Sequence, residues 1–196
     1  MMLNGWRSKY TVKKYRTSKG VNEADCKNEI QREFSVGQKK RSIVTDLTYI
    51  NVQGKWHYIC TLLDLSTRKI VSHSIGVHKN ASLVMTAISQ LPMNLSSIDI
   101  FHSDRGKEFD NQLIDDCLTT FGIKRSLSKK GCPYDNAVAE ATFKSIKTEF
   151  VKGEKFTSLE HLQARFDQYV NWFNYIRLHS SLDYQTPMEF QNQQTL

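Results

Sequence analysis

The sequence contains no long apolar run, and this absence excludes a large class of proteins. No stretch of the 196 residues approaches the roughly 20 apolar residues that a helix needs to cross a bilayer. The N-terminal segment also lacks the apolar core of a secretory signal. We therefore expect neither a membrane span nor export.

Cysteine is scarce, and its spacing excludes two further classes. The four cysteines, Cys26, Cys60, Cys117 and Cys132, are far apart and form no C-x-x-C pair. Neither a zinc ribbon nor a disulfide scaffold is therefore indicated, and reduced thiols in a cytosolic protein are the expectation. The sequence also shows no internal repeat and no helix-turn-helix of useful length.

The positive charge of the chain is unevenly distributed. The net charge is +7, and residues 1–41 hold 11 Lys and Arg against four Asp and Glu, whereas the remaining residues hold 16 of each kind. The whole excess therefore lies in an N-terminal arm, as expected for a surface that binds a polyanion. Charge alone fits a solvated tail equally well.

Runs of β-branched residues alternate with amphipathic runs and predict a mixed α/β domain. Three adjacent strands with short connections favour an antiparallel meander, which crossovers to further strands then follow. We expect a mixed five-stranded sheet flanked by helices. The expected strands are 42–52, 56–65, 68–77, 97–101 and 123–127, and the expected helices are 80–91, 111–121, 136–152 and 158–178.

This pattern also sets the expected domain boundaries. Residues 1–41 are predicted as a basic arm with one short helix near 22–33, residues 42–178 as the core domain, and residues 179–196 as a C-terminal tail. A capping box at 157–160 is expected to begin the last long helix. The aromatic residues Trp172, Phe173 and Tyr175 on that helix are expected to pack in the core.

Asp46 lies in an otherwise apolar strand. Val44, Asp46, Thr48 and Ile50 share one face of that strand, because side chains alternate along it. A buried carboxylate is costly unless it is paired or binds a metal. A satisfied structural aspartate and a metal ligand are about equally good interpretations of this strand alone.

Asp104 follows the predicted strand 97–101. Open α/β sheets bind ligands beyond the ends of their strands, so an aspartate at this point is well placed for a site. From position alone, an ordinary turn aspartate beside Gly106 is the simpler interpretation. His102 is near enough to suggest a base, although a structural hydrogen-bonding role is the expectation.

Glu140 lies on a polar face of the predicted helix 136–152. Asn136, Lys144 and Lys147 share this face, and a solvated Glu–Lys pair four residues apart is the alternative to a functional role. The adjacent face is apolar and is expected to pack on the core. Its members are Ala139, Phe143, Ile146 and Phe150.

The three carboxylates together suit metal-dependent phosphoryl transfer. Hard oxygen ligands can clamp two Mg²⁺ ions roughly 3.5–4 Å apart, one to activate the attacking water or 3′-hydroxyl and one to stabilise the leaving oxygen. Two aspartates on neighbouring strands and a glutamate on a packed helix can supply these ligands. We therefore predict Asp46, Asp104 and Glu140 as catalytic metal ligands, with Mn²⁺ as a possible substitute for Mg²⁺.

The spacing of these residues resembles that of a known family. Thirty-five residues separate Asp104 from Glu140, and Lys147 follows Glu140 by seven positions. This resembles the D,D(35)E pattern of retroviral-integrase-type transposases. The runs 45–50, 102–106, 131–137 and 172–182 with 186–187 resemble more closely the OrfB-type transposases of the third bacterial insertion-sequence family, over residues 29–190.

The resemblance implies an RNase H-like fold, dependence on Mg²⁺, and cleavage and joining of DNA strands. It assigns the metal-ligand roles to the three acidic residues, and to Lys147 a contact with DNA at the element's end. Asp135 is interpreted as a helix N-cap and Asn136 as a DNA contact or a support for the site. A basic cluster beside the site is expected to follow the DNA backbone, with an aromatic residue that stacks on a base or fills its loop. These residues are Lys144, Arg105, Lys129, Lys130 and Tyr134.

The leading interpretation is a DNA transposase that cuts the ends of an insertion element and joins them to target DNA. A truncated, non-catalytic DNA-binding remnant and a stand-alone RNase H-type nuclease are the alternatives. The expected partners are the terminal repeats, the target DNA, further copies of the chain during synapsis and a helix-turn-helix protein from an upstream reading frame. The expected location is the bacterial cytoplasm, at the nucleoid.

Overall fold

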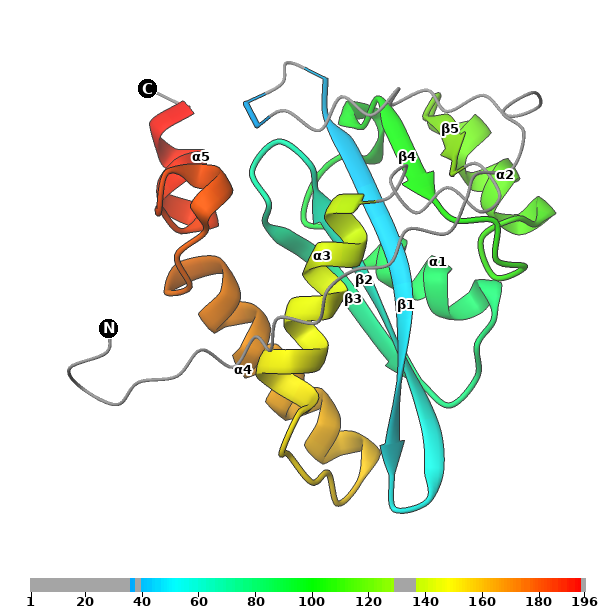
Figure 1. The fold of residues 1–196 in the computed structure, drawn as a ribbon. Coiled ribbons are helices and arrows are strands. Elements are labelled where there is room, and N and C mark those ends of the chain that lie inside the picture. The colour runs from blue at the N-terminus through cyan, green and yellow to red at the C-terminus, as the bar shows by residue number, and fades with distance from the viewer. Residues whose placement is uncertain (1–35, 38–39, 129–136, 195–196) are drawn as a thin grey trace, which may run out of the picture.

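The structure is a computed structural model that describes residues 36–37, 40–128 and 137–194. A five-stranded sheet with the strand order β3-β2-β1-β4-β5 forms its centre (Figure 1). An antiparallel meander supplies three strands, and two further strands add in parallel on the other side of β1, so the predicted mixed sheet is confirmed. The strands are β1 (Ser42–Val52), β2 (Lys55–Asp64), β3 (Ile70–Gly76), β4 (Ile100–Ser103) and β5 (Lys124–Leu127).

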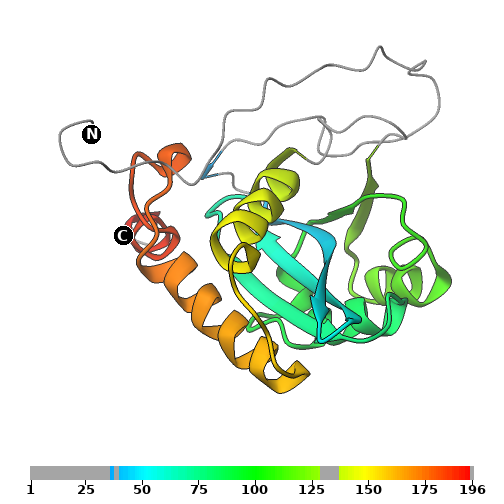
Figure 2. The same cartoon turned by 60° about the horizontal axis from the view of Figure 1, so that its bottom comes forward.

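Helices cover both faces of the sheet and create two separate cores (Figure 2). Neighbouring residues of β1 point to opposite faces, so that Ile43 packs in one core and Val44 in the other. The first face carries α1 (Ala81–Ser89) and α2 (Gln112–Thr120). The second face carries α3 (Ala137–Ser145), its continuation η4 (Ile146–Val151) and α4 (Leu159–Tyr175).

The hairpin between β1 and β2 and the link between β2 and β3 have different turns. Gln53 and Gly54 both have positive φ angles, 49° and 83°, as the two central residues of a type I′ turn require. Arg68 also has a positive φ of 61°, and its backbone N–H donates to the carbonyl of Asp64. The third strand therefore begins at Ile70, two residues later than predicted.

Two predicted elements differ from the structure in their extent. The short turn η2 (Leu95–Ser97) occupies the start of the strand predicted at 97–101, and β4 instead runs to Ser103. The helix predicted at 136–152 is described from Ala137 and changes from an α-helix to a π-helix at Ile146. The backbone N–H of Lys152 accordingly donates to the carbonyl of Lys147, five residues earlier, at 3.0 Å.

The C-terminal part of the chain is more ordered than the predicted tail at 179–196 implies. It contains η5 (Ser180–Leu182) and α5 (Pro187–Gln194), and α5 packs on α4. The N-cap of α4 is Ser158 and not Thr157, and its hydroxyl accepts from the backbone N–H of His161 at 3.1 Å, so the prediction of a capping box at 157–160 is wrong. The helix predicted near 22–33 lies outside the described residues.

No helix in the described part of the chain combines the length and the apolar character that a membrane crossing requires.

Candidate active site at the open edge of strand β1

The edge of β1 next to β4 is open along most of its length. The two strands pair in parallel only at Ser42–Val44, because β4 is four residues long. No other strand of the described residues covers this edge from Thr45 onward. Side chains that follow the last pair, Val44 with His102, can therefore meet groups from other elements.

Asp46 and Asp104 lie at the same level of this edge. Asp46 is two residues beyond Val44 on β1, and Asp104 is two residues beyond His102, after β4. Because the strands are parallel, equal steps from one pair bring both aspartates to the same end of the sheet. The Asp104 carboxylate is half-buried and accepts from the backbone N–H of Gly106 at 2.8 Å.

The Asp46 carboxyl group is half-buried between the sheet and α3. Its pKa is raised to about 6, first by burial and then by the negative charges of Asp104 and Glu140. The backbone N–H of Leu47, which donates to Asp46 Oδ1 at 2.7 Å, and the charge of Lys147 oppose this rise in the pKa. An ionised Asp46 is therefore unfavourable without a cation beside it.

Glu140 comes to the site from the first turn of α3. The apolar face of this helix packs on the sheet as predicted, with Ala139, Phe143, Ile146 and Phe150 all buried. Glu140 itself is exposed, and partial burial raises the pKa of its carboxyl group. Since its charge affects Asp46, the structure brings all three predicted residues into one electrostatic neighbourhood.

The three carboxylates are neighbours without forming a tight cluster. Among residues 36–37, 40–128 and 137–194, no three His, Cys, Asp or Glu side chains are close enough to hold a metal ion as they stand.

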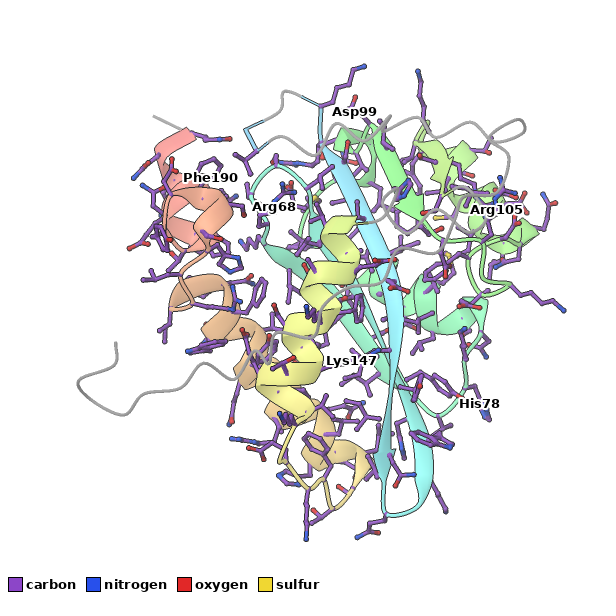
Figure 3. The ribbon with its side chains drawn as sticks, viewed as in Figure 1. Arg68, His78, Asp99, Arg105, Lys147 and Phe190 are labelled. Carbon is purple, nitrogen blue, oxygen red and sulfur yellow. The ribbon has the colours of Figure 1, made fainter. Side chains whose placement is uncertain are left out.

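Only part of the predicted DNA-contacting set is described. Lys147 and Arg105 lie on opposite sides of β1 (Figure 3). The ammonium nitrogen of Lys147 is 5.8 Å from the centre of the Tyr49 ring, and Arg105 Nε donates to the carbonyl of Ser128 at 3.1 Å. Lys144 is exposed on α3. Lys129, Lys130, Tyr134, Asp135 and Asn136 lie outside the described residues.

An ion pair between exposed Lys79 and buried Glu108, beside the two aspartates, was not predicted from the sequence. Lys79 Nζ lies 2.8 Å from Glu108 Oε1, and Glu108 is only 6% exposed. The pKa of Lys79 is raised first by this hydrogen bond and also by the charges of Asp104 and Asp46, so the pair borders the site. The sequence gives no sign that these residues, 29 positions apart, meet.

His102 has the structural role that we expected. Its ring is fully buried, with Nδ1 2.8 Å from the hydroxyl of Ser126 and Nε2 3.1 Å from the hydroxyl of Ser128. Both ring nitrogens therefore connect β4 to β5 and to the segment after it.

Comparison with solved structures defines the class of fold. The chain superimposes on a chain of the simian T-cell lymphotropic virus intasome with a TM-score of 0.65 and 13% identity, over 86% of this chain and 60% of the other. The HTLV-2 integrase catalytic core domain in complex with magnesium (trimeric form) gives a TM-score of 0.61 and 14% identity, over 79% of this chain and 98% of the other. The chain therefore has the RNase H-like fold of integrase catalytic cores.

Sequence comparison then identifies the family. Two family models, both described as Integrase core domain, match residues 38–133 and 140–195. The putative transposase InsK for insertion sequence element IS150 of Escherichia coli (strain K12) is 29% identical over 184 residues, 93% of this chain and 65% of that protein. The transposase InsF for insertion sequence IS3fB of the same strain is 30% identical over 173 residues, 85% of this chain and 59% of that protein.

The chain belongs to the integrase core family and is similar to its insertion-sequence transposases. It spans less than two thirds of the length of these two relatives. The predicted family and fold class are thus confirmed.

Proposed function

We propose that this chain is the catalytic core of a DNA transposase, which uses Asp46, Asp104 and Glu140 to hold divalent metal for the cleavage and joining of DNA strands. Its family and its transposase relatives support the type of activity. The observation that carries the assignment to these residues is that Asp46 and Asp104 lie at the same end of the open edge of β1, with Glu140 of α3 close enough for its charge to act on Asp46. The raised pKa of Asp46, which is due first to burial and then to the other two acidic groups, agrees with this assignment.

The donor set fits a hard divalent cation. All three side chains offer carboxylate oxygens, the ligands that Mg²⁺ prefers. A solved relative in fold, the HTLV-2 integrase catalytic core, was determined in complex with magnesium, and Mn²⁺ accepts the same oxygen ligands. When bound, such a metal supplies charge stabilisation and activation of the attacking oxygen during phosphoryl transfer.

The protein's own residues orient the site and the DNA. Gly106 holds one oxygen of Asp104, and Leu47 holds one oxygen of Asp46, so each carboxylate has a fixed direction. Lys147, whose charge acts on Asp46, supplies positive charge for the DNA phosphates, and so do Lys144 on α3 and Arg105, which follows Asp104 in the chain. We extend this role to Lys129 and Lys130, propose that Tyr134 stacks on a base and that Asn136 contacts DNA, and expect the chain to work as an oligomer on two DNA ends.

The remnant alternative is not favoured. Family models match both parts of the integrase core, before and after the segment 134–139. All three positions of the predicted metal site carry an acidic residue.

A plasmid-nicking assay tests the proposal. The purified chain, incubated with Mg²⁺ or Mn²⁺ and supercoiled DNA or labelled element ends, should nick DNA only when the metal is present. Asp46→Asn, Asp104→Asn and Glu140→Gln should each reduce the rate roughly 100-fold or more, because each removes one charged ligand. Asp116→Asn is the matched control, because this exposed aspartate on α2 pairs with Gln112 far from the site.

Two other outcomes select the alternatives. Salt-sensitive DNA binding with no cleavage under either metal would support the remnant. Faster cleavage of RNA–DNA hybrids than of DNA ends would support the nuclease.

A further inference from the structure

Two large aromatic side chains lie exposed on the hairpin that carries Asp46. Tyr49 is 60% exposed and Trp56 is 54% exposed, whereas aromatic side chains usually bury a large part of their surface in the core or in an interface. Their rings meet edge to face with centroids 5.2 Å apart, and the Lys147 ammonium lies over the Tyr49 ring. Tyr49, Trp56 and Lys147 thus form one surface, which we call the aromatic platform.

From this surface we propose that the aromatic platform binds an unpaired nucleobase of the DNA substrate, next to the acidic residues. This inference rests on the proposed function, and it identifies an unpaired base as the part of the DNA substrate that this surface binds. Exposed aromatic rings stack on any base, and a nearby cation attracts the phosphate that the base carries. A cross-strand aromatic pair that merely stabilises a hairpin would need no cation beside it.

The location of the platform favours a nucleic acid over a protein partner. Tyr49 is three residues after Asp46 on β1, a step of about 10 Å along the strand, and its side chain therefore points to the opposite face of the sheet. Lys147 links the two positions, because its charge acts on Asp46 and its ammonium lies over the Tyr49 ring. A base stacked on Tyr49 would therefore belong to a nucleotide whose backbone passes Lys147 at the open edge of β1. The open edge of β1 continues from Asp46 to Tyr49, so no described strand separates the two positions.

Lys147 lies at the start of the π-helical segment η4, which begins one residue earlier at Ile146. Such turns are frequent at functional sites. The ammonium of Lys147 lies over the Tyr49 ring, so this segment contributes a cation to the platform.

The test compares DNA with and without a base at the proposed position. Duplex oligonucleotides with a short single-stranded extension are prepared in two forms, one with intact bases in the extension and one with abasic sugar-phosphate units. Fluorescence anisotropy should show that the intact chain binds the base-bearing extension about tenfold more tightly. Tyr49→Ala and Trp56→Ala should remove most of this preference, whereas Tyr49→Phe should keep it. Tyr175→Ala, at an exposed tyrosine on α4, is the matched control.

Thermal unfolding checks that each variant folds. We expect normal folding, because the side chains of Tyr49 and Trp56 are both exposed. Three outcomes overturn the inference: no preference for the base-bearing DNA, no DNA binding at all, or the same preference in Tyr49→Ala and Trp56→Ala as in the unaltered chain. A change in oligomeric state with an unchanged preference would assign the surface to a protein contact instead. A preference for base-bearing DNA without metal-dependent nicking would support the inference and contradict the proposed function. Metal-dependent nicking without this preference would support the proposed function and contradict the inference.

Discussion

At the scale of single residues, Asp46 should lower the stability of the metal-free fold. Its pKa of about 6 lies above the ordinary value of 3.8, so the folded chain holds this proton more tightly than the unfolded chain does. The free energy of unfolding should therefore fall as pH rises from about 4 to about 6, by about 3 kcal/mol, and then stay level. Urea unfolding with a chelator present measures this.

The Asp46→Asn variant should lack this fall and should be more stable than the unaltered chain above about pH 7, because an amide carries no charge to desolvate. Asp116→Asn should show the same pH profile as the unaltered chain. Equal pH profiles for Asp46→Asn and the unaltered chain would show that the burial of this carboxylate costs nothing.

Gly106 should be intolerant of even a single added carbon. A Cβ at this position would lie 2.4 Å from Glu108 Oε1, and Glu108 is buried and held by Lys79. Gly106→Ala should therefore displace the ion pair and lower the free energy of unfolding by about 2 kcal/mol. Chemical denaturation measures this, with Gly54→Ala as a steric comparison because nothing lies within 4 Å of its added Cβ.

Gly54→Ala is also expected to lower stability, because Gly54 has a positive φ that alanine rarely adopts. A second substitution is therefore needed to separate the steric effect at Gly106 from the backbone effect at Gly54. Glu108→Ala should relieve the clash at Gly106 and leave the effect at Gly54 unchanged. If Gly106→Ala costs the same with and without Glu108, the close contact is not the cause.

At the scale of elements, one ion pair joins η4 to the segment that follows α4. Arg177 Nε and one terminal nitrogen each donate to Glu149 at 2.8 Å, and Tyr169 donates to the same carboxylate at 3.2 Å. Both charged side chains are mostly buried, so the removal of one of them leaves the charge of the other buried and uncompensated. Arg177→Met should lower the free energy of unfolding by about 3 kcal/mol.

The double variant Arg177→Met with Glu149→Gln should recover much of this loss, because no buried charge is left unpaired. The comparison is made by urea unfolding, with Arg165→Met as control, since Arg165 forms an exposed pair with Glu154. Additive losses in the double variant would contradict a coupled pair.

Elements with a clear hydrophobic period could be predicted, and elements set by tertiary contacts could not. The apolar face of α3 was predictable because Ala139, Phe143 and Phe150 recur at helical spacing. The π turn at Ile146 was not, since one extra residue in a turn leaves this spacing nearly unchanged. Helix α5 is rich in polar residues and packs on α4, so its sequence carries little period of its own.

Helical spacing also misplaced two aromatic residues on α4. Phe173 is buried as predicted, but Tyr175 is 56% exposed and Trp172 is 37% exposed. Aromatic character alone does not show which side of a helix is covered. The Lys79–Glu108 pair escaped prediction for a related reason, since only the packed fold brings these two residues together.

At the scale of the whole molecule, metal binding should be coupled to folding. A cation that binds only the folded chain stabilises it, by about 2.7 kcal/mol at a hundredfold excess over its Kd. Mg²⁺ should thus raise the melting temperature of the chain by several degrees at about pH 8. The gain should shrink as pH falls through 6, because protons then compete for Asp46, whose pKa lies near that value.

Differential scanning calorimetry of three proteins decides whether this stabilisation comes from the acidic residues. The unaltered chain and Asp116→Asn should show equal shifts with Mg²⁺, and Asp46→Asn should show little or none. Cations that merely screen charge on the surface would shift all three alike, because each variant removes only one charge from the same surface. Equal shifts would therefore contradict a metal site at Asp46, whereas a loss confined to this variant would show that folding and metal binding depend on the same carboxylate.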